Sequence, residues 1–159
     1  MIRLDGQSTI EEDHAQLHPR LLYTIAGLHL EGDAYTLPGW DRKICKIAFN
    51  VLLNANSYHD ARAVIAGKLE GDDALARAGL LIREMKKQHA GLRGYFHSGI
   101  GRRLQNLDSD MAEFVLTRLL RQGIVALPIH DSFVVQKRHA GHLKEAMEAS
   151  FSLIRCDRF

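Results

Sequence analysis

Residues 123–136 read GIVALPIHDSFVVQ, and this stretch decides the fold. Two runs of β-branched and apolar residues, 124–129 and 132–136, flank the polar pair His130-Asp131. Such runs, joined by so short a connection, predict a β-hairpin. The pair then lies at the hairpin tip. Asp131 is there either an exposed carboxylate on a rigid scaffold or an ordinary turn residue that stabilises its own backbone.

A second hairpin is expected at the start of the chain. The sequence predicts a short strand near Ile2–Leu4, a turn at Asp5-Gly6 and a second strand over Ser8–Glu12, because Asp-Gly is a strong hairpin signal. Asp13 directly follows this second strand, as Asp131 stands at the end of another. If the two strands are neighbours in one sheet, their carboxylates converge.

Helices are expected for most of the remaining chain. A helical period begins at Leu17, and Asp41 can cap a helix from Arg42 to about Asn54. Asp72 or Asp73 can cap another. Further helices are predicted over residues 58–69, from about 73 to 89, 104–122 and 140–154. The expected fold class is therefore α+β: a small antiparallel sheet of two hairpins, packed by several helices in a helix-rich chain.

Composition limits the broad class of protein. The chain has 159 residues, the size of one domain, with 46% hydrophobic and 25% charged residues, as in soluble globular proteins. No apolar run is long enough to span a bilayer, so no membrane partner and a cytoplasmic location are expected. Cys45 and Cys156 lie far apart and match no zinc spacing, so free or buried thiols are expected.

The charge distribution is more informative than the net charge of +2. A stretch of 21 residues from position 83 to 103 contains a single acid, Glu84, and several basic residues. A local excess of this kind can neutralise nucleic-acid phosphates, although a solvated helix face gives the same pattern. The basic residues are Arg83, Lys86, Lys87, Arg93, Arg102 and Arg103.

Asp13 and Asp131 are the residues best suited to hold divalent cations. Carboxylate oxygens suit Mg²⁺, which takes its other ligands from water and substrate phosphates, and two such ions assist phosphoryl transfer. Arg42, Lys46 and Asn50 recur every four residues and share one stripe of a helix. Arg42 and Lys46 on that stripe could bind a triphosphate.

Three segments resemble the conserved motifs of single-subunit polymerases, the group of family A DNA polymerases and phage-type RNA polymerases. Residues 13–20, DHAQLHPR, resemble motif A, in which an Asp closes a strand and an Arg follows. Residues 42–54, RKICKIAFNVLLN, resemble the motif B helix of the fingers. Residues 127–135, LPIHDSFVV, resemble motif C of the phage-type RNA polymerases, with its His-Asp pair and Ser-Phe. The motif C match is the most specific.

The resemblance implies a palm-like domain over residues 1–159 with a short fingers-like helical insertion at about 38–95. It implies a template-directed nucleotidyltransferase that joins a nucleoside triphosphate to a 3′-OH on a primer–template, using Mg²⁺ or Mn²⁺ held by Asp13 and Asp131. Lys46 is implied as a catalytic residue beside these two. The implied nucleotide contacts are Arg42, Lys46, Asn50, Asn54, His18, Arg20 and His130.

Several positions depart from the polymerase motifs. His14 replaces the usual aromatic residue after the first Asp, His18 stands where DNA polymerases place a Glu, and Asn54 replaces a Tyr. Selectivity for ribose or deoxyribose therefore stays open. The chain is also short for a polymerase, so we expect a catalytic core or a remnant of one, with another polypeptide supplying a thumb or a template-binding domain.

Two other classes of protein remain open. One is a catalytically silent palm-like module that binds nucleic acid or a partner chain. The other is a small metal-dependent hydrolase, because His14 and His18 are four residues apart and close to Asp13. Arg20 is equally an ion-pair partner for a core acid or a phosphate ligand.

Overall fold

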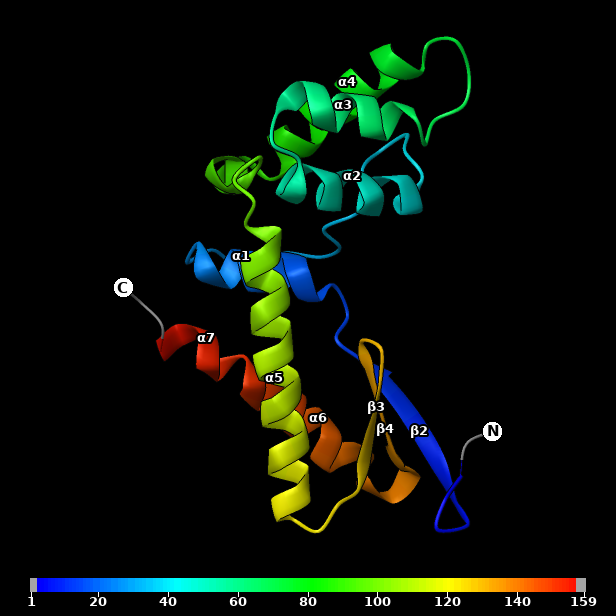
Figure 1. Ribbon diagram of the computed structural model, residues 1–159, viewed down its shortest axis with the longest axis vertical. Coiled ribbons are helices and arrows are strands. Elements are labelled where there is room, and N and C mark those ends of the chain that lie inside the picture. The colour runs from blue at the N-terminus through cyan, green and yellow to red at the C-terminus, as the bar shows by residue number, and fades with distance from the viewer. Residues whose placement is uncertain (1–2, 157–159) are drawn as a thin grey trace. The chain divides into compact units, whose positions relative to one another are not determined.

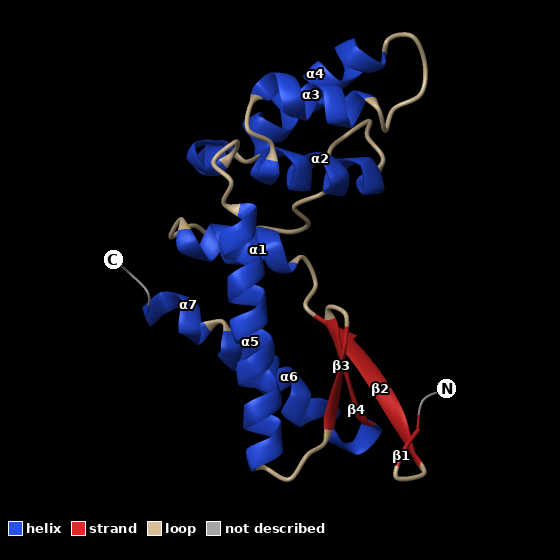
Figure 2. Cartoon of the chain, in the orientation of Figure 1, coloured by secondary structure: helices blue, strands red, loops and turns tan. Residues whose placement is uncertain are grey.

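The computed structural model describes residues 3–156, and its fold is α+β as expected. Helices and strands are shown in Figures 1 and 2. The chain divides into two compact units. The sheet unit contains the residues up to Ile25 and those from Asn106 onward, and the helical unit is Ala26–Gln105. The helical insertion expected at about 38–95 thus falls within a compact unit that extends beyond it on both sides.

The sheet has four antiparallel strands among the described residues. They are β1 (Arg3–Leu4), β2 (Gln7–Asp13), β3 (Ala126–Ile129) and β4 (Ser132–Gln136), in the spatial order β1-β2-β4-β3. The first hairpin turns at Asp5-Gly6, whose φ values are 50° and 74°. Asp-Gly predicts such a turn because both positions favour positive φ. Ile2, expected in the first strand, lies outside the described residues.

The core of the sheet unit forms on one face of the sheet. β4 is the most enclosed strand, with all five residues buried. Phe133 and Val135 form an apolar cluster with Ile124 and with residues of α5 (Gly101–Arg121) and α6 (Ala140–Ser150). Figure 1 shows these two helices beside the sheet. The helix residues of this cluster are Val115, Leu119, Leu143, Ala146 and Met147. Since side chains alternate along a strand, Ser132 and its cross-strand partner Asp13 occupy the opposite face.

The helices of the sheet unit differ from expectation mainly at the C-terminal end. α1 (Leu17–Ile25) packs against α7 (Ser152–Cys156), and a 3-10 turn, η2 (Lys137–His139), precedes α6. One helix was expected over 140–154, but the structure breaks it at Phe151. The hydroxyls of Ser150 and Ser152 each donate to a helix carbonyl, at 2.6 Å, and such local bonds compete with the helical ladder.

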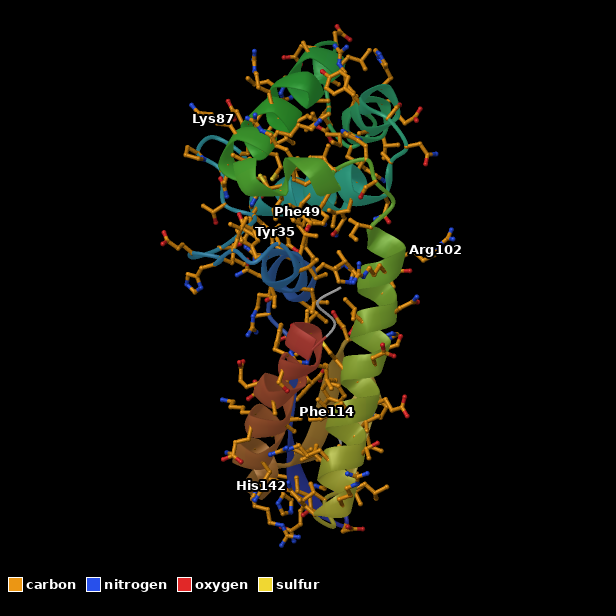
Figure 3. The ribbon with its side chains drawn as sticks, turned by 90° about the vertical axis from the view of Figure 1, so that its left-hand side faces the viewer. Tyr35, Phe49, Lys87, Arg102, Phe114 and His142 are labelled. Atoms are coloured by element: carbon orange, nitrogen blue, oxygen red, sulfur yellow. The ribbon has the colours of Figure 1, made fainter. Side chains whose placement is uncertain are left out.

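The helical unit packs around one fully buried aromatic side chain. Its elements are α2 (Arg42–Asn54), α3 (Tyr58–Ala66), α4 (Ala74–Gln88) and the 3-10 helix η1 (Ala90–Tyr95), and α2, α3 and α4 contact one another. Phe49 on α2 lies edge-on to Tyr35, His89 and Phe96, with ring centroids 5.8, 5.1 and 6.0 Å away. Figure 3 labels Tyr35 and Phe49 in this core.

Helix caps follow the prediction in one case and contradict it in another. Asp41 caps α2, its Oδ1 accepting from the backbone N–H of Lys43 and Ile44 at 2.9 and 3.1 Å. Asp73 stands at the N-cap of α4 but makes no capping hydrogen bond. Its carboxylate lies 3.9 Å from Arg77 instead, so this predicted cap is wrong.

Within residues 3–156, no helix combines the length and the apolar character that crossing a membrane requires.

Candidate functional site

The pairing of β2 with β4 brings Asp13 next to the tip of the second hairpin. Asp13 lies opposite Ser132, the residue that directly follows Asp131. Both aspartates are exposed. Among the described residues, neither carboxylate accepts a hydrogen bond or forms an ion pair. The expected adjacency of the two strands is therefore confirmed, while the metal-binding role of the two aspartates stays a prediction.

The tip itself is a two-residue turn, His130-Asp131, closed by the pair Ile129 and Ser132. His130 adopts φ +55°, a left-handed conformation that non-glycine residues seldom take, although His takes it more readily than most. The turn therefore holds the backbone of His130 in a left-handed conformation directly before Asp131. His130 is exposed, as its predicted nucleotide contact requires.

Glu11 is a neighbour of the site that the sequence reasoning missed. It shares the sheet face of Asp13, two residues away on β2, where period-two alternation could have found it. Its Oε1 lies 2.6 Å from the Oγ of Ser132, which also lies 2.9 Å from the carbonyl oxygen of Ile129. Because a hydroxyl has one proton, Ser132 donates to one of these acceptors at a time.

Arg20 and His14 are held by aromatic packing in the sheet unit. Arg20 lies 4.1 Å from the ring centre of Phe151 and 3.3 Å from Glu148. It is thus an ion-pair partner, although of an exposed acid and not of a core acid. His14 is edge-on to Phe133 and Phe151, and its Nε2 is buried with no hydrogen-bond partner among the described residues. Burial foremost, and then the charge of Arg20, lowers the pKa of His14.

The described residues contain no group of three or more His, Cys, Asp and Glu side chains placed to hold a metal ion. The His14, His18 and Asp13 site expected for a hydrolase is therefore not assembled, since His14 turns into the aromatic packing and His18 lies half-buried on α1. A pair of carboxylates alone still suits Mg²⁺, which keeps several waters and shares substrate phosphates.

The two candidate nucleotide-binding cations of α2 differ in whether they already have a partner. Arg42 donates from Nε to Asp33 at 2.6 Å and lies over the Tyr35 ring, and the hydrogen bond with Asp33 raises the pKa of Arg42. Burial raises the pKa of Tyr35 to about 12. Lys46 is exposed and has no hydrogen-bond or ion-pair partner within residues 3–156.

Two asparagines end the same helix. The Nδ2 of Asn54 donates to the carbonyl oxygen of Asn50 at 2.8 Å, and Asn50 is half-buried. The Asn54 amide also covers Gly101 so closely that an added Cβ would collide with it. Asn54 is exposed, and its amide already contacts Asn50 and the start of α5, so its predicted nucleotide contact stays a prediction.

The structure separates the basic stretch into two groups. Arg83, Lys86 and Arg93 line one pocket in the helical unit. Lys87 and Arg102, both labelled in Figure 3, are exposed. Neither is among the lining residues of the pocket, and Arg103 is half-buried on α5. The sequence could not separate them, because the division depends on how η1 folds back beside α4.

Comparisons of this chain with protein-family models, with curated proteins and with solved structures give no match.

Proposed function

We propose that this chain is a nucleotidyltransferase of the polymerase type, with Asp13 and Asp131 as its metal-binding pair. The observation that carries the proposal is the register of β2 and β4. This register sets two exposed carboxylates, 118 positions apart in the sequence, at one end of neighbouring strands. The resemblance of residues 13–20 to motif A and of residues 127–135 to motif C also supports these two aspartates as metal ligands.

The donor set fits Mg²⁺ or Mn²⁺. Asp13 and Asp131 offer hard oxygen ligands, and both carboxylates are open to solvent. When bound, the metal supplies positive charge that stabilises the attacking and leaving oxygens of phosphoryl transfer. Ser132 and Glu11 hold the strand ends beside the pair through the 2.6 Å hydrogen bond between them. This bond limits the motion of the backbone that carries Asp131.

Within the helical unit, α2 carries the candidate triphosphate ligands. Arg42 and Lys46 are four residues apart and share one helix face. Lys46 is exposed and available, whereas Arg42 can turn to a phosphate only by sharing its guanidinium with Asp33. We therefore expect Lys46 to contribute more to triphosphate affinity than Arg42.

Metal titration with and without a nucleoside triphosphate tests the proposal. For the wild-type chain, calorimetry should show Mn²⁺ binding that the triphosphate strengthens. Asp131→Asn and Asp13→Asn should each lose at least about tenfold in metal affinity, because each removes a charged ligand. Asp110→Asn is a matched control, since it removes the same charge from an exposed residue of α5.

Two outcomes would contradict the proposal. If the wild-type chain binds neither metal nor triphosphate, the catalytically silent module becomes the better account. If Asp110→Asn weakens metal binding as much as Asp131→Asn does, the metal responds to net charge and not to a site at the hairpin tip.

A further inference from the structure

A surface pocket of about 530 Å³ lies between α3, α4 and η1, and all its lining residues belong to the helical unit. Such a volume suits a small ligand. Three of its lining residues are basic: Arg83, Lys86 and Arg93. The lining also includes Tyr58 and Leu80, which are 39% and 38% exposed. We name this cavity the α3–α4 pocket.

The positive charge of the pocket is not neutralised from within. None of its eight lining residues is acidic. Glu84, the single acid of the basic stretch, accepts instead from the indole N–H of Trp40 at 2.7 Å. Within residues 3–156, Arg83, Lys86 and Arg93 form no ion pair. Burial, and next the charge of Arg93, lowers the pKa of Lys86, as expected for cations gathered without a counter-charge.

Two of the three cationic side chains, those of Lys86 and Arg93, are restrained by contacts within the unit. The Nε of Arg93 donates to the carbonyl oxygen of Lys86 at 3.1 Å, which anchors the guanidinium at the pocket. The Nζ of Lys86 lies 3.0 Å from the Nε2 of His97 and 5.9 Å from the centre of the Tyr58 ring. Side chains held in this way lose little freedom when they bind an anion, so more of the interaction energy appears as affinity.

A glycine makes room for the aromatic wall. Gly79 lies in the middle of α4, where glycine costs about 1 kcal/mol relative to alanine. A Cβ at this position would come 3.1 Å from the hydroxyl oxygen of Tyr58 and 3.4 Å from the Nε of Arg62. The absence of a side chain therefore lets Tyr58 lie against α4 and form one wall of the pocket.

We propose that the α3–α4 pocket binds the phosphate group of a nucleotide, either free or within a single strand, with the base against Tyr58. Arginine and lysine side chains are the usual protein ligands of phosphate. A basic site beside an exposed aromatic ring is the arrangement that binds single-stranded nucleic acids, because bases stack on the ring while cations hold the backbone. The inference does not depend on the aspartate pair.

Calorimetry on the full chain in EDTA tests the pocket, since EDTA removes any metal and so silences the aspartate site. The probes are inorganic phosphate, adenosine 5′-monophosphate and an oligothymidylate of eight nucleotides. Lys86→Gln should weaken binding of each probe that the wild type binds by at least about tenfold, because it removes a charged donor. Lys68→Gln, which removes the same charge from an exposed residue after α3, should change affinity less than about twofold.

A second variant separates the phosphate from the base. Tyr58→Leu should lower the affinity for adenosine monophosphate at least about fivefold, because stacking on an aromatic ring is lost. The affinity for inorganic phosphate should stay unchanged. The probe that binds most tightly identifies the source of the phosphate. Tighter binding of the oligothymidylate would identify a single strand as the ligand, and tighter binding of the monophosphate would identify a free nucleotide.

Three results would overturn the inference. The first is no binding of any probe by the wild type at millimolar concentration. The second is an equal loss of affinity in Lys86→Gln and in Lys87→Gln, which removes the neighbouring charge outside the pocket, because a diffuse basic surface would respond in this way. The third is an equal loss in Lys68→Gln. Asp131→Asn should leave all these affinities unchanged, so the pocket and the proposed function fail or succeed separately.

Discussion

Ser132 is a buried residue of β4 that lies next to both candidate metal-binding aspartates. It is only 5% exposed, and its hydroxyl reaches both Glu11 and the carbonyl oxygen of Ile129. It also sits between Asp131 and the cross-strand position of Asp13. A residue in this position determines how firmly the two aspartates are held, although it is itself buried and uncharged.

Replacement of Ser132 by Ala should lower the free energy of unfolding by about 1 kcal/mol, the usual net value of one hydrogen bond. The loss stays small because Glu11 is exposed and can turn to water. Urea titration followed by circular dichroism measures the change. Ser8→Ala, an exposed position on β2, is the control and should be neutral. A loss of more than about 3 kcal/mol would mean that the hydroxyl also supports contacts that this bond does not explain.

The buried residue His89 should make stability depend on pH. It is 1% exposed, its Nε2 lies 2.9 Å from the carbonyl oxygen of Ala34, and burial lowers its pKa from the ordinary 6.5. The unfolded chain therefore takes up a proton at a pH where the folded chain does not. The stability that His89 contributes is complete above 6.5 and is lost as the pH falls below it.

Urea titrations at pH 7.5 and 5.0 measure this effect. The free energy of unfolding of the wild-type chain should fall by up to about 1.4 kcal/mol per pH unit between the unfolded and the folded pKa of one such histidine. His89→Gln should be less stable at pH 7.5, because the packing on Phe49 is lost, but should show a smaller drop on acidification. His29→Gln, an exposed position, should keep the full drop. An unchanged drop in His89→Gln would assign it to His14 and His97, whose pKa values are also lowered by burial.

Two helices of the same unit differ in how they begin, and this allows a matched comparison. Asp41 caps α2 with two hydrogen bonds, whereas Asp73 makes none at the start of α4. Asp41→Ala should therefore lower the free energy of unfolding by about 1 kcal/mol. Asp73→Ala should change it by less than about 0.5 kcal/mol, since only an exposed 3.9 Å contact with Arg77 is lost. Equal effects in thermal melts would show that charge near the helix start, and not capping, stabilises both helices.

At the scale of elements, the sequence predicted those parts of the fold that local signals determine. Asp5-Gly6 fixed the first turn, the alternating runs around His130-Asp131 fixed the second, and Asp41 fixed the start of α2. The break at Phe151 was missed because it depends on side-chain hydroxyls competing for helix carbonyls. The start of α5 at Gly101, before the expected residue 104, was also missed, because glycine is an unfavourable helix residue. The Asn54 amide that contacts this glycine comes from a position far away in sequence.

For the candidate site, the sequence predicted which strands would be neighbours but not which side chains would already be engaged. Arg42 and Lys46 look equivalent in the sequence, yet only Arg42 has an acidic partner, Asp33, from a loop whose path no local signal specifies. The α3–α4 pocket was hidden for the same reason. Tyr58 meets Lys86 only because α3 and α4 pack together.

At the scale of the whole molecule, charge limits what the chain can do alone. A polymerase holds a primer–template duplex largely through Lys and Arg contacts to phosphates. This chain has 21 basic and 19 acidic residues, for a net charge of +2. Of the six basic residues in the stretch from 83 to 103, three line the α3–α4 pocket, which is the size of a small ligand and not of a duplex. Within this stretch, only Lys87, Arg102 and Arg103 therefore lie outside the pocket to contact a duplex.

The purified chain should accordingly be a weak polymerase at best. Duplex affinity should be low, and log affinity should fall with log salt with a small slope, because few phosphates are contacted. Primer extension at physiological salt should therefore be absent, although Mn²⁺ and triphosphate still bind. A partner polypeptide that binds the duplex should allow primer extension. The assay runs the wild type beside Asp131→Asn and Asp110→Asn. Extension by the wild type and by Asp110→Asn, abolished in Asp131→Asn, would contradict this expectation, because it would show that two carboxylates and a sparse basic surface suffice for synthesis.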